Sequence, residues 1–137
     1  MLTVLQKKLR MQEYDLYEYA VIRLVPKVER GEFFNVGLVM LCKQKGWVQM
    51  DYYLDNGILS AFCSDIEEEF IIENLEGFKN IIEGKCTASP IAKLEPAERF
   101  RWMTAVRSSS IQTSRPRVGK TEDLEKTFSE LFEELVL

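Results

Sequence analysis

The chain has 137 residues, of which 46% are hydrophobic and 29% are charged, a composition typical of one soluble globular domain with a buried core. It contains no histidine, which excludes catalytic triads and zinc sites that depend on this residue. No apolar run reaches the roughly 18 residues of a membrane-spanning helix, and neither a Walker loop nor a GxGxxG fingerprint is present. We therefore expect no cofactor and no membrane span.

The cysteines indicate the compartment. Cys42, Cys63 and Cys86 are odd in number and lack CxxC spacing, which is typical of reduced thiols in a cytoplasmic protein. The first ten residues, MLTVLQKKLR, lack the long apolar region and the small-residue cleavage site of a secretory signal. We predict a poorly defined arm over residues 1–14, with Met11 as an alternative start, followed by a single domain over residues 15–137.

Charges are segregated along the chain, although the net charge is only −4. Residues 65–86 hold seven acids against two lysines, and residues 87–120 hold seven bases against two acids. Residues 121–137 hold six acids against one lysine. This pattern has two interpretations. The basic side chains can pair with acidic helices of the same domain, or they can form an exposed patch that binds anions.

Three strands are predicted in the first half, over residues 17–25, 33–42 and 47–54, because β-branched and aromatic residues dominate there. The second is almost continuously apolar, which favours a central strand covered on both faces. Gly37 within it indicates a bulge or a close approach by another group. The first strand is also apolar on both faces, so Arg23 on it requires a partner, either an acid or a bound anion.

The hydrophobic period becomes helical after Asp55. A capping box that begins at Ser64 predicts a helix that ends at Gly84. Pro96 predicts the first turn of a second helix, which should run to about Val106.

The last part of the chain is predicted to contain one more strand and one more helix. Residues 109–114 form a short strand that gains most by pairing with the strand over residues 17–25, residues 115–120 form a loop, and Thr121 caps the final helix. Together these elements predict an α+β fold in which helices cover a mainly antiparallel sheet of about four strands.

The basic, serine-rich stretch over residues 99–120 suggests one polar site. Guanidinium groups bind phosphate or carboxylate by paired hydrogen bonds, and hydroxyls add further donors. We expect Arg23 and Arg107 to lie within one side chain's reach, with Ser109 or Gln112 between them. The full set of candidate anion-binding residues is Arg23, Arg30, Arg107, Ser108, Ser109, Ser110 and Gln112. The alternative is that these arginines pair with Glu32, Asp51 or the acidic helices.

Other functions have weaker signals. Glu32, Asp51 and Asp55 could hold a hard cation such as magnesium, although their spacing is not diagnostic. A serine with Lys120 as its base is a further enzymatic alternative. Nucleic-acid binding is suggested by the basic stretch and Trp102, while the acidic pI argues against a general phosphate-binding surface.

Two segments resemble a known bacterial family. YAVIRLVPKVERGEFFNVGLVML at residues 19–41 and RFRWMTAVRSSSIQTS at residues 99–114 are similar to the two signatures of domain of unknown function 3037. In that family the second motif often has a proline before its arginine and a histidine near the later glycine. This chain has Val106 and Arg117 at the corresponding places, which argues against catalysis by a histidine.

The resemblance implies a small cytosolic bacterial protein without an established activity, and some members are encoded beside kinase-like proteins of the HipA type. The hypothesis that follows is a non-enzymatic binding or regulatory module, with a kinase-like protein as its possible partner. An anion- or nucleic-acid-binding protein is the first alternative, and a carboxylate-metal enzyme is the second.

Overall fold

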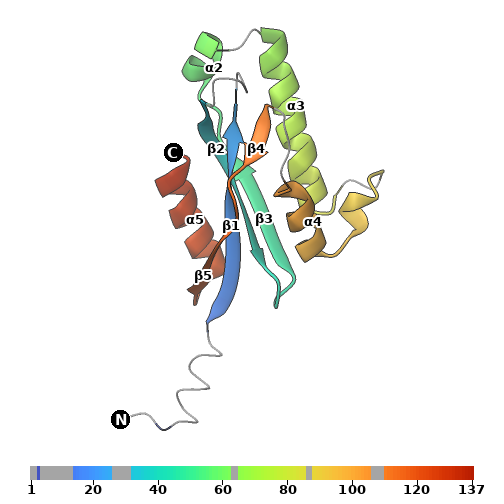
Figure 1. The fold of residues 1–137 in the computed structure, drawn as a ribbon, viewed down its shortest axis with the longest axis vertical. Helices are drawn as coiled ribbons and strands as arrows, with labels where there is room; N and C mark the ends of the chain where they lie inside the picture. The colour runs from blue at the N-terminus through green and yellow to red at the C-terminus, as the bar shows by residue number, and fades with distance from the viewer. Residues whose placement is uncertain (1–2, 4–13, 26–31, 63–64, 86–87, 106–109) are drawn as a thin grey trace.

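The computed structural model of the chain describes residues 3, 14–25, 32–62, 65–85, 88–105 and 110–137. Figure 1 shows its strands side by side, with helices on either flank. In chain order the elements are β1 (Asp15–Leu24), β2 (Phe34–Cys42), β3 (Trp47–Tyr52), α2 (Asn56–Phe62), α3 (Asp65–Ile82), the 3-10 turn η2 (Ile91–Lys93), α4 (Pro96–Met103), β4 (Ile111–Thr113), β5 (Arg117–Thr121) and α5 (Leu124–Leu135). The predicted α+β fold is confirmed.

The sheet has five strands, and every pair in it is antiparallel. The order is β3-β2-β1-β4, and β5 also pairs with β1. β1 has ten residues, so it accommodates β5 along its first half, where Tyr19 lies opposite Arg117, and β4 at its end, where Leu24 lies opposite Ile111. The predicted pairing between the first strand and the short strand after α4 is confirmed.

β2 is the central strand that its apolar sequence predicts, because it lies between β1 and β3 and its last seven residues are buried. On one face, α3 and α4 pack over a cluster that includes Val39, Leu75 and Phe100. On the other face, α5 packs over a second cluster that includes Leu38 and Phe128. Alternate side chains of one strand therefore enter two separate cores.

The prediction of a loop over residues 115–120 is wrong, because residues 117–121 form β5. Its sequence, RVGKT, has little intrinsic preference for a strand, and pairing with β1 supplies the missing stabilisation. The ring of Tyr17 lies across Gly119 in this pair, so a larger residue would displace the ring. A Cβ atom at position 119 would stand 2.5 Å from Cζ of Tyr17.

Two helices also differ from prediction. α4 ends at Met103 rather than near Val106, and the hydroxyl of Thr104 donates to the Phe100 carbonyl at 2.9 Å. Such a side-chain bond competes with the helical backbone pattern. α2 was not predicted; the Asp55 carboxylate accepts a hydrogen bond from the Gly57 N–H at 2.8 Å where this helix begins.

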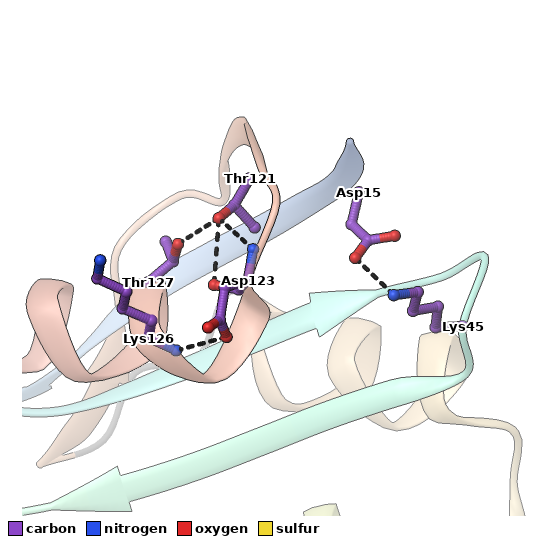
Figure 2. A network of polar contacts seen from close by, with 6 residues as sticks. All are labelled: Asp15, Lys45, Thr121, Asp123, Lys126 and Thr127. Atoms are coloured by element: carbon purple, nitrogen blue, oxygen red, sulfur yellow. Dashed lines mark hydrogen bonds and ion pairs between the residues drawn. The ribbon is translucent and has the colours of Figure 1, made fainter. Parts of the chain in front are cut away.

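The cap of α5 is Asp123 and not Thr121 as predicted (Figure 2). The Asp123 carboxylate accepts from the backbone N–H of Lys126 at 3.1 Å. The hydroxyl of Thr121 accepts from the Asp123 N–H at 3.0 Å and bonds the hydroxyl of Thr127 at 2.5 Å. Thr121 therefore fastens the end of β5 to the first turn of α5.

We expect Asp123→Ala to lower the free energy of unfolding by about 1 kcal/mol, because an N–H of the first helical turn loses its acceptor. Glu122→Ala removes the same charge from the neighbouring exposed residue and is expected to change stability by less than about 0.5 kcal/mol. Urea unfolding measures both variants. Equal losses would show that charge, and not capping, determines the effect.

Cys42 is a buried free thiol in β2, as predicted, whereas Cys63, Cys86 and nearly all of the predicted arm over residues 1–14 lie outside the described residues. Within the described residues, no helix combines the length and the apolar character that crossing a membrane requires.

Candidate anion-binding site

A row of polar side chains crosses the α5 side of the sheet near the end of β1. Arg23 lies directly opposite Asn35 of β2 on one side and Gln112 of β4 on the other. Directly opposed residues of antiparallel strands project from the same face. Arg23 shares this face with Tyr19, which packs against the cluster beneath α5.

A bulge in β2 determines which way Asn35 points. The register between β1 and β2 shifts between Ile22 and Arg23, so that β2 has one extra residue, Val36. An extra residue reverses the alternation of faces beyond it. Val36 therefore enters the core beneath α3 and α4, while the Asn35 amide points to α5 and donates to the Leu135 carbonyl at 3.1 Å.

Arg23 and Asn35 border a cavity of about 160 Å³. Its wall combines side chains of β1, β2, β5 and the segment before β5 with the last turn of α5. The lining residues are Tyr19, Val21, Arg23, Asn35, Ser114, Arg117 and Leu135. Among the described lining residues are two arginines and no acid, so their side chains carry a net positive charge.

Arg23 is partly buried and packs against an aromatic ring. Its Nε atom is buried and has no hydrogen-bond partner within the described residues. Its guanidinium carbon lies 4.2 Å from the centre of the Phe33 ring, so an aromatic face covers one side of the cation. An acid is one of the two partners that the sequence predicts for the charge of Arg23. No described carboxylate forms an ion pair with this residue. A buried donor without an acceptor is costly, so an incoming anion would find an unsatisfied group.

Arg117 reaches the same cavity from β5 and is exposed. No ion pair involves it among the residues that the structure describes. Arg101 provides the contrast, because its guanidinium bonds the Glu18 carboxylate at 2.7 Å. Four residues of β1, about 13 Å of strand, separate Tyr19 opposite Arg117 from Arg23, a span that two long arginine side chains can bridge around one anion.

The hydroxyl of Ser114, a neutral group of the cavity wall, is already engaged. The Ser114 hydroxyl accepts from the Val21 N–H at 2.9 Å and donates to the Arg115 carbonyl at 3.3 Å. Burial, and secondly the neighbouring Tyr19, raise the pKa of the Tyr17 phenol above its ordinary value. Tyr17 therefore stays neutral at physiological pH and brings no negative charge beside the cavity. The two guanidinium groups are the charged donors that line the cavity.

Ion pairs within the described fold balance only part of the segregated charge of the sequence. Arg101 pairs with Glu18 of β1, and Lys79 of the acidic helix pairs with Asp51 at 3.4 Å, so part of the charge is balanced within the fold. In the described part of the chain, Arg115 and Arg117 have no such partner. Intramolecular pairing thus explains some of the bases, and those around β5 are left exposed.

The predicted site residues are placed as follows. Arg23 and Gln112 lie side by side across β1 and β4. Ser110 borders a different cavity, of about 300 Å³, next to Phe70 of α3. Arg30, Arg107, Ser108 and Ser109 lie outside the described residues, so the expected proximity of Arg23 and Arg107 stays a prediction.

Tyr19, Asn35, Ser114 and Arg117 were not among the predicted site residues. Tyr19 could have been found from strand alternation, because it precedes Arg23 by four residues on the same face. The sequence predicts a loop at Arg117, and only Gly37 indicates the bulge that orients Asn35.

The carboxylates considered as metal ligands have structural partners. Asp51 accepts from the Tyr52 N–H at 2.9 Å and from Lys79, and Asp55 accepts from the Gly57 N–H. No group of three or more histidine, cysteine or acidic residues is suited to hold a metal ion in the described ranges. The side chain of Lys120 belongs to the opposite face of the β1–β5 pair from Arg117, since the two are three residues apart on one strand.

Fold and cavity together define a small α+β protein with a cavity that two arginines line. The chain belongs to the family described as "Protein of unknown function (DUF3037)", whose family model matches residues 19–136. The resemblance seen in the two sequence segments is thus confirmed. Neither a curated protein nor a solved structure matches the chain significantly.

Proposed function

We propose that this protein is a non-enzymatic binding module and that the cavity between β1, β5 and α5 binds an anionic group, a carboxylate or a phosphate, of its ligand. One observation carries the proposal: a buried guanidinium nitrogen of Arg23 lacks an acceptor in a cavity that Arg117 also lines. An anion supplies the missing acceptor and balances both charges.

Binding is favoured over catalysis by the groups available in the cavity. The chain has no histidine, and Ser114, the serine among the described lining residues, has its hydroxyl engaged with backbone groups. Arginine stays protonated in proteins, so it serves poorly as a general base. The remaining chemistry is the recognition of negative charge.

The partner that we propose is a protein, and a kinase-like protein is the specific hypothesis that the family resemblance suggests. Such a partner would present the anionic group as an acidic or phosphorylated side chain. Nucleic-acid binding is less well supported, because the cavity is small and the chain has a pI of about 5.0. A cytoplasmic location remains part of this proposal.

Phosphate titration followed by thermal melting tests the site. Wild-type protein is expected to gain about 1.4 kcal/mol at a tenfold excess of phosphate over Kd, with a saturating rise in Tm. Arg117→Gln should lose most of that rise, because one of the two guanidinium donors is gone. Arg115→Gln is the matched control, since it removes the same charge two residues away from a side chain that does not line the cavity.

Chloride at the same ionic strength provides the baseline for all three proteins, because screening alone also changes stability. A phosphate shift of equal size in wild type, Arg117→Gln and Arg115→Gln would show that no specific anion site exists in this cavity.

A further inference from the structure

β5 leaves one side of the sheet open next to the proposed site. The strand pairs with β1 along residues 117–121, and no strand of the described chain pairs with its other side. Figure 1 shows it at the margin of the sheet, where the chain passes on to α5. The outer edge of such a strand presents backbone N–H and C=O groups that can pair with another extended chain.

The side chains of β5 favour a negatively charged occupant. Arg117 and Lys120 are exposed and form no ion pair with a described residue. Charges of this kind also protect edge strands from unwanted pairing. Val118, between them, has the opposite effect, because 79% of it is exposed on the edge strand. An exposed valine between two cations that form no ion pair with a described residue fits an edge that receives another strand better than a protected edge.

We propose that an extended acidic segment of a partner protein adds to β5 as a further strand and places one carboxylate in the cavity at Arg23 and Arg117. The inference rests on the proposed anion site and names its ligand. Main-chain hydrogen bonds along the edge provide affinity, and alternate side chains provide specificity, as in other cases of strand addition.

The register of β5 determines which side chains the segment should carry. Arg117 and Gly119 face α5, whereas Val118 and Lys120 face the α4 side, as the opposed pairs with β1 show. An incoming strand therefore places an acid opposite Arg117, an apolar residue opposite Val118 and a second acid opposite Lys120. Hydrogen bonds from Thr121 to the cap of α5 hold the end of this strand in place.

Two acetylated, amidated hexapeptides probe this arrangement: Thr-Glu-Val-Thr-Glu-Thr, and the same residues in reverse order, because the added strand can run in either direction. We expect one of them to bind wild-type protein in calorimetry. Replacing both glutamates by lysine should abolish binding. Val118→Thr, at an exposed position where the fold tolerates the change, should weaken binding several-fold.

Backbone methylation separates strand addition from simple capture of a carboxylate. Two methylated versions of the binding peptide are made. One carries methyl groups on the odd-numbered backbone nitrogens, and the other carries them on the even-numbered ones. Only one set faces β5 in a strand pair, so one version should bind at least about tenfold more weakly and the other about as well as the parent.

The outcomes distinguish a failure of strand addition from a failure of the anion site. Suppose that both methylated versions bind as tightly as the parent peptide, and that Arg117→Gln weakens the binding of all three peptides. Strand addition is then overturned and the anion site stands. If phosphate binds but neither peptide does, strand addition is again overturned. If Arg117→Gln, shown by melting to be folded, binds both phosphate and peptide as wild type does, the anion site itself is refuted and the inference that rests on it fails.

Discussion

Val36→Asp is expected to lower the free energy of unfolding by more than about 3 kcal/mol. Val36 is only 6% exposed and belongs to the core beneath α3 and α4, together with Leu24 and Leu59. A carboxylate at this position would be buried among apolar side chains without a partner, and the apolar area of valine would also be lost.

Urea unfolding measures the effect, and Val118→Asp is the control. The control introduces the same charge into another strand, at a position that is 79% exposed, and should cost less than about 1 kcal/mol. A loss below about 1 kcal/mol for Val36→Asp would mean that this end of β2 is exposed, contrary to the fold.

The second large effect is expected for Gly37→Ala, with a loss of about 1–3 kcal/mol of unfolding free energy. A Cβ atom at position 37 would stand 2.8 Å from the backbone carbonyl oxygen of Asp51 and 3.1 Å from Cδ1 of Ile22. Both neighbours belong to paired strands, so neither can move without disturbing the sheet at the bulge.

Gly77→Ala is the matched control for this substitution. Gly77 lies within α3, and a Cβ atom there would meet nothing within 4 Å. Alanine is favoured over glycine inside helices, so this variant should gain up to about 1 kcal/mol. Stabilisation by both substitutions would contradict the close contact at Gly37.

Much of the fold is encoded locally. The unbroken apolar run of β2 predicts its central position, because only a strand covered on both faces can bury consecutive side chains. β5 could not be predicted in this way, since its five residues include one apolar side chain and a glycine. Its strand conformation depends on pairing with β1, about one hundred residues earlier in the chain.

The cap of α5 illustrates a different limit. Thr121 and Asp123 are both residues that favour the position before a helix, and local sequence does not decide between them. The structure uses both, Asp123 as the cap and Thr121 as the link to β5.

The candidate site is only partly accessible to sequence reasoning. Arg23 stands out because a cation on an otherwise apolar strand needs a partner. Asn35 could not be placed, since its face depends on the extra residue of the β2 bulge. Arg117 could not be joined to Arg23 without the register of β5 on β1. The site is thus built by pairing between distant segments, and periodicity within each segment does not determine it.

The proposed function depends on Arg23 and Arg117 binding one anion together. The most direct measurement follows the Nε–H signals of the arginines by NMR during a phosphate titration, with assignments from Arg23→Lys, Arg117→Lys and Arg115→Lys. We expect large, saturating shifts for Arg23 and Arg117 with a common Kd, and only a small linear drift for Arg115. The same small linear drift at all three arginines, without saturation, would contradict the proposed function.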